Sequence, residues 1–372
     1  MRKDNTIEAF FSLVRAGLWE TDVQLASYGE LDYENILRIA QEQSVVGLVA
    51  AGLEHITDVK VPQVVALQFA GETIQLEQRN KAMNQFIADL VTEMRNADIY
   101  TLLVKGQGVA QCYDRPLWRA CGDIDLFLSD DNYNKAKDLL LPLASDVEQE
   151  AVFSRHLGMT IDTWMVELHG SLRMGMPARI NRVLDEIKSE SFCGGEVSSW
   201  ANGITQIFLL SHENNVVYVF AHFLAHFYKG GIGLRQICDW ARLLWVHRND
   251  LDFRKAGKHI KRMGLMTEWE AFSAFAVDYL GMPKEAMPFF KEETKWRRKA
   301  KRISDFVIMS GNFGHNRDMT YLTKHPYIIR KFISFGRRVS DLVHHASLFP
   351  LDTLRFAPSF LFHGLSSAIN GE

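Results

Sequence analysis

Two aspartates that lie one residue apart, Asp123 and Asp125, stand inside an apolar run typical of a β-strand. Side chains alternate between the two faces of a strand, so both carboxylates point the same way. Ile124, Leu126 and Leu128 point the other way and can enter a core. Neighbouring carboxylates repel unless a positive charge lies between them, and Mg²⁺ is a hard cation that prefers oxygen ligands. The pattern predicts a magnesium site, although Asp-x-Asp pairs also occur on exposed strands and loops.

A third carboxylate is expected from a later strand. The segment from Val147 to Leu172 is predicted to form strands, and Glu167 closes the apolar sequence Trp164-Met165-Val166 within it. Placed beside the two aspartates, Glu167 would complete a three-carboxylate metal site. His169 projects to the same side of the strand, where it either lines an acceptor pocket or orients Glu167. His156 is a weaker candidate for the same role.

A phosphate-binding turn is predicted upstream of the aspartates. The β-prone run from Tyr100 to Val104 ends at Lys105-Gly106-Gln107-Gly108, and a short helix is predicted from Val109 to Tyr113. A strand that runs into a glycine-containing turn and a helix start can direct backbone N–H groups toward a phosphate. Lys105 equally fits a surface lysine at the end of a strand.

Helical spacing of apolar residues predicts helices on both sides of these strands. Upstream, a one-faced stripe of Leu76, Met83, Ile87, Leu90 and Met94 predicts a helix that faces a core. Helix is expected to return from about residue 177 onward, with Arg235 and Asp239 spaced for a local salt bridge. The predicted helices run from Ile7 to Ala16, Leu31 to Gln43, Val46 to His55, His212 to Tyr228, Leu234 to His247, Phe253 to Met263, Glu268 to Tyr279 and Ala286 to Met309.

Composition narrows the class of protein. A chain of 372 residues is long enough for two or three domains, and its 47% hydrophobic and 23% charged content is ordinary for a globular protein. The net charge of −3 gives no general affinity for nucleic acid. The four cysteines show no metal-binding spacing, which favours a reducing, cytoplasmic setting. We expect neither a secretion signal nor a membrane span.

Three further features have ordinary explanations that we prefer. His222 and His226 share a helix face with zinc-compatible spacing, but no glutamate follows His222, so core histidines are expected. The basic residues between Lys291 and Arg302 predict a solvated helix face, with nucleic acid or anionic lipid as alternatives. The segment from Tyr327 to Phe362 mixes aromatic and basic residues; it either packs against its own domain or makes peripheral contact with a membrane.

Taken in order, these residues resemble the polymerase-beta-type nucleotidyltransferase superfamily. They are more similar still to its bacterial branch described as uncharacterised nucleotidyltransferases, over roughly residues 1–360. The resemblance rests on Lys105-Gly106, Arg119, the strand from Gly122 to Leu126, the sequence from Val166 to His169, and a Leu-Arg-Gln-x-x-Asp run from Leu234 to Asp239. The chain departs from the wider superfamily in having Lys-Gly in place of Gly-Ser, and a long gap between Gly106 and Asp123.

The resemblance implies an α+β fold: a nucleotidyltransferase-fold core with a small mixed β-sheet, flanked by N-terminal and C-terminal helical regions. We expect residues 1–98 to form the N-terminal helical region, residues 99–190 the nucleotidyltransferase core, and residues 191–372 the C-terminal helical domain.

The resemblance also implies a reaction. Asp123, Asp125 and Glu167 would bind Mg²⁺ and carry catalysis, while Lys105, Gly106, Arg119 and His169 would contact the nucleoside triphosphate. A nucleoside monophosphate would pass from the triphosphate, with ATP the expected donor, to a hydroxyl of a small molecule, sugar or protein, releasing pyrophosphate. The alternative is a non-catalytic nucleotide-binding or interaction protein with the same fold. An RNA-modifying transferase is disfavoured by the net charge.

Overall fold

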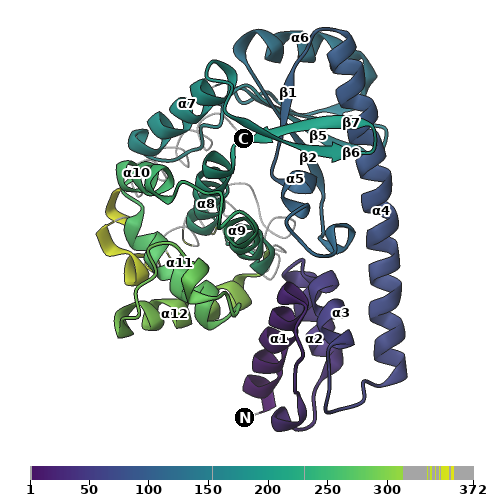
Figure 1. The fold of residues 1–372 in the computed structure, drawn as a ribbon, viewed down its shortest axis with the longest axis vertical. Helices are drawn as coiled ribbons and strands as arrows, with labels where there is room; N and C mark the ends of the chain where they lie inside the picture. Colours follow the sequence, from purple (N-terminus) through teal and green to yellow (C-terminus); the bar gives the residue numbers. More distant parts are fainter. Residues whose placement is uncertain are drawn as a thin grey trace.

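The computed structural model describes residues 2–152, 154–229 and 231–312, together with 333, 336, 340, 343, 345–351 and 353–355. A group of N-terminal helices lies at one end of the molecule and the β-sheet at the other (Figure 1). A second helical group lies beside both, and one long helix, α4, runs along the opposite edge. The fold class is therefore α+β with helices on both sides of a mixed sheet, as the sequence predicted.

The N-terminal helices confirm the predicted spacing. They are α1 (Arg2–Trp19), α2 (Tyr33–Glu42) and α3 (Val46–Glu54). Helices α1 and α3 approach so closely that a β-carbon at Gly17 would stand 1.9 Å from the Leu48 carbonyl oxygen, and one at Gly52 would stand 2.1 Å from that of Leu13. Glycine is required at both places because any side chain would push the two helices apart.

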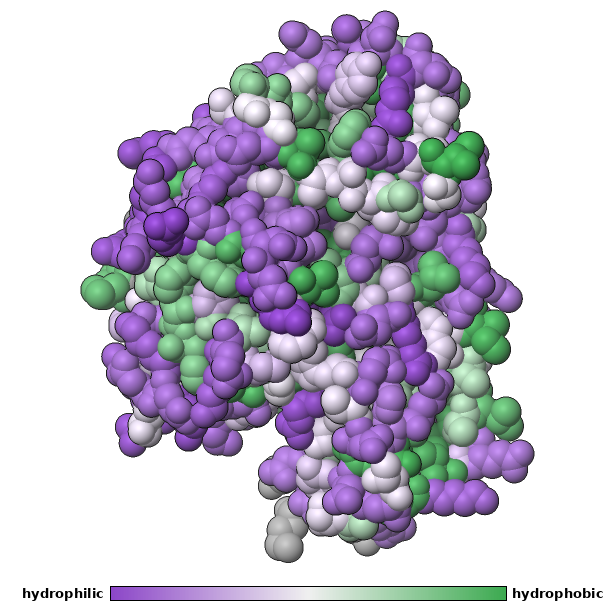
Figure 2. All heavy atoms as spheres, in the orientation of Figure 1, coloured by the Kyte–Doolittle hydropathy of each residue, from purple (hydrophilic) through white to green (hydrophobic). Residues whose placement is uncertain are grey.

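Helix α4 (Gln63–Asn96) links this helical group to the sheet. The predicted stripe is confirmed where the helix crosses the sheet, since Met83, Ile87, Leu90 and Met94 are buried there. The first turns of α4 expose apolar side chains instead, namely Val64, Leu67 and Ile74. Figure 2 shows several hydrophobic residues, in green, along this edge of the molecule.

One seven-stranded sheet contains every named strand, in the order β3-β4-β5-β2-β1-β7-β6. Central strand β2 runs parallel to β5 and antiparallel to β1. The bounds are β1 (Thr101–Val104), β2 (Asp123–Leu128), β3 (Ala144–Val147), β4 (His156–Ile161), β5 (Trp164–His169), β6 (Val197–Asn202) and β7 (Thr205–Leu210). The short α5 (Gly106–Ala110) follows β1, and α6 (Asp130–Leu140) follows β2 with Ser129 as its N-cap.

The expectation of helix throughout the chain beyond residue 177 is wrong for residues 197–210. These residues form a hairpin of β6 and β7, and β7 joins the sheet edge by pairing in parallel with β1. Gly203, with φ 60°, opens the tight turn between the two strands. Strand β6 alternates exposed and half-exposed residues, so it lacks the apolar run from which the earlier strands were predicted.

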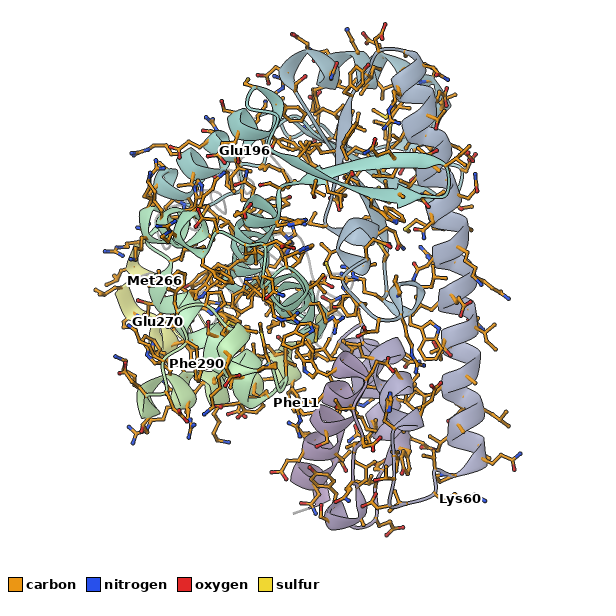
Figure 3. All side chains as sticks on the ribbon, viewed as in Figure 1. Phe11, Lys60, Glu196, Met266, Glu270 and Phe290 are labelled. Carbon is orange, nitrogen blue, oxygen red and sulfur yellow. The ribbon has the colours of Figure 1, made fainter. Side chains whose placement is uncertain are left out.

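The second helical group surrounds an aromatic core. Its helices are α7 (Ala178–Phe192), α8 (His212–Lys229), α9 (Leu234–Val246), α10 (Phe253–Met263), α11 (Met266–Asp278) and α12 (Thr294–Ser310). The rings of Phe220, Trp240 and Trp269 lie 4.7–5.2 Å apart between α8, α9 and α11. Phe11 of α1, labelled in Figure 3, reaches the same group, and its ring centroid lies 6.3 Å from that of Phe275. This contact ties the N-terminal helices to the second helical group.

The structure bears on the basic residues near α12, the cysteines and the expected lack of a membrane span. Several basic residues near α12 pair with neighbouring acids, as Lys291 does with Glu270 and Arg297 does with Glu292, which agrees with a solvated face. All four cysteines are free. None of the helices among the described residues has the length and apolar character needed to cross a membrane. The predicted segment from Tyr327 to Phe362 lies largely outside the described residues.

We expect the stacked pair of His212 and His247 to make the stability of the protein fall in acid. His247 stacks on His212 with ring centroids 3.6 Å apart, and burial, aided by repulsion from His212, lowers the pKa of His247 to about 4. The unfolded chain binds this proton near pH 6.5 but the folded protein only near pH 4, so the free energy of unfolding falls as the pH drops between these values. Between pH 7 and about pH 4.5, we expect wild type to lose about 1 kcal/mol more stability than His247→Gln, since solvent screening at this partly exposed ring reduces the full effect of the shift. Urea denaturation measures this, and equal losses would contradict it.

Candidate active site

Strand register brings the three predicted carboxylates together. Asp125 on β2 lies beside Glu167 on the parallel neighbour β5, and Asp123 stands two residues before Asp125. Adjacent residues of paired strands, and residues two apart on one strand, share a face of the sheet. A ligand oxygen from each of the three side chains lies within 4.8 Å of the others. Asp125 is almost fully buried, whereas Asp123 and Glu167 are partly exposed.

Lys105 supplies the positive charge nearest to this cluster. Its Nζ lies 2.6 Å from Asp125 Oδ1. Lys105 and Gly106 both have positive φ, and a β-carbon at Gly106 would meet Cys121 Sγ at 3.3 Å, so the turn is folded tightly against the start of β2. Burial works to lower the pKa of Lys105, but attraction to Asp125 outweighs it and raises that pKa. The ammonium therefore stays charged.

Two imidazoles hold Glu167. His156 Nε2 lies 3.1 Å from Glu167 Oε2, and His169 Nε2 lies 3.3 Å from the same oxygen and 2.8 Å from Asp125 Oδ1. Burial tends to raise the pKa of Glu167, but the two histidine hydrogen bonds outweigh it and hold that pKa well below its usual range. Burial likewise opposes protonation of His169, while the bonds to Asp125 and Glu167 raise its pKa. Glu167 is therefore firmly anionic.

The carboxylate cluster fits a divalent cation. Repulsion from Asp125, reinforced by burial, raises the pKa of Asp123. The charge of Lys105 is thus not enough to offset the electrostatic repulsion among the three carboxylates. An oxygen-seeking dication such as Mg²⁺ would relieve it, with Asp123, Asp125 and Glu167 as its protein ligands.

Arg119 is held by an ion pair with Asp239 of α9. Its Nε and Nη2 donate to the two oxygens of Asp239 at 3.0 and 2.6 Å, and the Tyr113 hydroxyl also donates to Asp239. The predicted local pair between Arg235 and Asp239 is therefore wrong, because Asp239 pairs with Arg119 instead. Arg235 donates from Nη1 to the Ala120 carbonyl oxygen at 2.8 Å, and its buried Nε has no hydrogen-bond partner among the described residues.

Two hollows meet at the carboxylates. A small one of about 50 Å³ is lined by Asp123, Asp125, Lys105, Arg119 and Arg235. A larger one of about 420 Å³ opens on the side of Glu167 and is bounded by β4, β5 and α8. Its lining includes Ser154, His156, His169, Tyr218, His222, His226 and Lys229.

Two histidines of α8, His222 and His226, line the larger hollow. His222 Nε2 lies 3.3 Å from both Lys105 Nζ and His226 Nε2. Burial, aided by the charge of Lys105, lowers the pKa of His222 well below its usual value and that of His226 to about 4. Both imidazoles are neutral near pH 7, and neither belongs to a metal-binding group of three among the described residues.

A family model described as uncharacterised nucleotidyltransferase matches residues 29–281, more than half of the chain. The chain belongs to this family. The matched residues include β1, β2 and β5, so the carboxylates of this nucleotidyltransferase family member lie within the shared region. No curated protein and no solved structure matches the chain.

Sequence reasoning identified the carboxylates of this family member but underrated two other residues. It named His156 only as a weak candidate, although His156 lies directly opposite His169 on the neighbouring strand. It assigned Arg235 to a pair within its own helix. Helix α9 is buried nearly all round, so its polar side chains find partners on other elements. Its sequence is amphipathic, with Arg235, Gln236, Asp239 and Arg242 among apolar residues, and gave no signal of this burial.

Proposed function

We propose that this family member is a Mg²⁺-dependent enzyme that transfers a nucleoside monophosphate from a nucleoside triphosphate, with ATP the expected donor, to a hydroxyl. The convergence of Asp123, Asp125 and Glu167 beside an open cavity supports this proposal most strongly. Bound Mg²⁺ would activate the attacking hydroxyl and neutralise charge on the leaving pyrophosphate. The acceptor is a small molecule, a sugar or a protein.

The bond changes define what the side chains must do. The acceptor oxygen forms a bond to the α-phosphorus, the bond from that phosphorus to the β-phosphate oxygen breaks, and pyrophosphate leaves. The hydroxyl proton leaves through water in the cavity to the solvent. Transfer of this kind depends on positioning and charge neutralisation, which suits a site made of three anions and nearby cations.

The cations have separate tasks in this proposal. The Lys105 ammonium balances Asp125 in the free protein and turns toward the triphosphate when a dication takes its place. Arg235 lines the same hollow as Asp123, and no carboxylate among the described residues lies within ion-pair distance of it. Its guanidinium is therefore the group most available to a phosphate. Arg119 forms an ion pair with Asp239 that fixes this part of the lining, and its positive charge lies at the small hollow.

The decisive experiment measures pyrophosphate. Purified protein with Mg²⁺ and each nucleoside triphosphate in turn is incubated with fractionated hydroxyl-containing metabolites and with protein. The proposal predicts pyrophosphate release that depends on Mg²⁺ and on one fraction. Binding of Mg-ATP without pyrophosphate release from any fraction would overturn transfer in favour of the nucleotide-binding alternative.

A variant of Arg235 tests the phosphate contact. We expect Arg235→Gln to weaken Mg-ATP binding about 10–100-fold, the loss expected for a charged hydrogen bond to phosphate, and to weaken AMP binding much less. Calorimetry on the folded variant measures both. Arg248→Gln is the matched control, because Arg248 packs on Trp245 and donates to its carbonyl oxygen. Equal ATP affinity in wild type and Arg235→Gln would show that Arg235 does not contact the triphosphate.

A further inference from the structure

A second set of donors lies on the same face of the sheet as the aspartates. His156 lies directly opposite His169 across antiparallel strands β4 and β5, and Glu167 is two residues from His169. Both relations place side chains on one face. The two imidazole rings are 4.7 Å apart and inclined by 30°, and both Nε2 atoms approach the same Glu167 oxygen.

The spacing of these three donors suits one bound cation. Their ligand atoms all lie within 4.8 Å of one another. Around a cation with bonds of about 2.1 Å, neighbouring ligand atoms stand roughly 3.0–3.4 Å apart. The observed separations of 3.1 Å from His156 and 3.3 Å from His169 to Glu167 fall within this range. Two of the three separations therefore match those around a cation, and the third, between the ligand atoms of the two imidazoles, is at most 4.8 Å.

The surroundings favour a ligand site over a pair of histidines that only orient Glu167. No lysine or arginine among the described residues forms an ion pair with Glu167, so the imidazoles are its only close partners. The side chains of His156 and Glu167 are 29% and 23% exposed and line the cavity of about 420 Å³. Three protein ligands with one open side are typical of catalytic metal sites, where water or substrate completes the coordination.

The donor types select the kind of cation. Two imidazoles and one carboxylate suit a transition-metal dication, whereas Mg²⁺ seeks oxygen alone. We propose that His156, Glu167 and His169 bind one transition-metal dication, from the group Mn²⁺ to Zn²⁺, beside the oxygen site of the aspartates. This inference rests on the proposed function and deepens it. Two cations that share one carboxylate can stand about 3.5–4 Å apart, the separation used in two-metal phosphoryl transfer.

Cobalt titration tests the site without a transfer assay. Metal-stripped protein in excess Mg²⁺ is titrated with Co²⁺, and the visible d–d absorption reports binding. We expect His156→Gln, which leaves all three carboxylates in place, to weaken Co²⁺ binding at least about 10-fold. The matched control is His212→Gln, which alters a histidine of the stack with His247 and should bind Co²⁺ as wild type does. Equal Co²⁺ affinity in wild type and His156→Gln would overturn the proposal.

Pulsed electron paramagnetic resonance on Mn²⁺-loaded wild type gives a second readout that does not depend on how a variant folds. Coupling of Mn²⁺ to imidazole ¹⁴N supports the site, and bound Mn²⁺ without such coupling overturns it. Mg-ATP binding is measured on the same samples by calorimetry. If Mn²⁺ is bound by nitrogen but the protein does not bind Mg-ATP, the cation site is supported and the transferase proposal is weakened. ATP binding without nitrogen-bound Mn²⁺ would overturn this site and leave the transferase proposal in place.

Discussion

Asp123→Asn is expected to reduce pyrophosphate release about 10³-fold or more without lowering stability. The amide keeps the shape of the side chain but removes one anionic ligand from the proposed magnesium set. The same change relieves repulsion from Asp125, which raises the pKa of Asp123 and so disfavours its charged form in the folded protein. The melting temperature should stay the same or rise. Activity assays and thermal melts on the same preparation measure both.

The control for this prediction is Asp131→Asn, an exposed aspartate in the first turn of α6, which should leave activity unchanged. Asp125→Asn should behave differently from Asp123→Asn, because Asp125 pairs with Lys105 and His169 and its loss leaves buried charge without a partner. Near-normal pyrophosphate release by folded Asp123→Asn would refute the assignment of the magnesium site.

Asp239→Leu is expected to lower the free energy of unfolding by about 3–5 kcal/mol. Arg119 and Asp239 are about 5% exposed and joined by two hydrogen bonds, and Tyr113 donates to the same carboxylate. The substitution leaves a buried guanidinium and a buried hydroxyl without their acceptor, which costs far more than the ion pair contributes. Denaturant unfolding at neutral pH measures the loss.

The double variant Arg119→Met with Asp239→Leu is the control, because it removes both charges and should recover most of the lost stability. Wild-type stability in Asp239→Leu alone would show that the pair is not a buried anchor. The double variant also tests whether Arg119 contacts the triphosphate directly. Restored stability together with strongly weakened Mg-ATP binding would assign Arg119 to the nucleotide as well as to Asp239.

The candidate site was predictable to the extent that it depends on local periodicity. Asp123 and Asp125 share a face because they are two residues apart on a strand, and Glu167 and His169 share a face for the same reason. The fold class was predictable because helical spacing covers both flanks of the β-prone segments, and the family match confirmed the resemblance. That these carboxylates bind magnesium remains a proposal.

Two predictions were wrong because the periodicity of apolar residues does not report sheet edges or contacts between distant segments. The hairpin of β6 and β7 lies at a sheet edge. Strand β6 is half exposed there and carries a weak apolar pattern. Arg235 was matched with Asp239 because helix spacing favours that pair. Arg119 is distant in sequence, yet it donates hydrogen bonds to both oxygens of Asp239.

The sequence by itself determined which residues carry charge on each strand and which face they take, because side-chain alternation is a local property of the backbone. Only the tertiary structure decided that β2 and β5 are neighbours in parallel register, that β4 adds His156 opposite His169, and that Arg119 rather than Arg235 holds Asp239. Those outcomes depend on pairing between distant segments, which competes among many possible partners and is settled by the burial of the whole sheet and its helices.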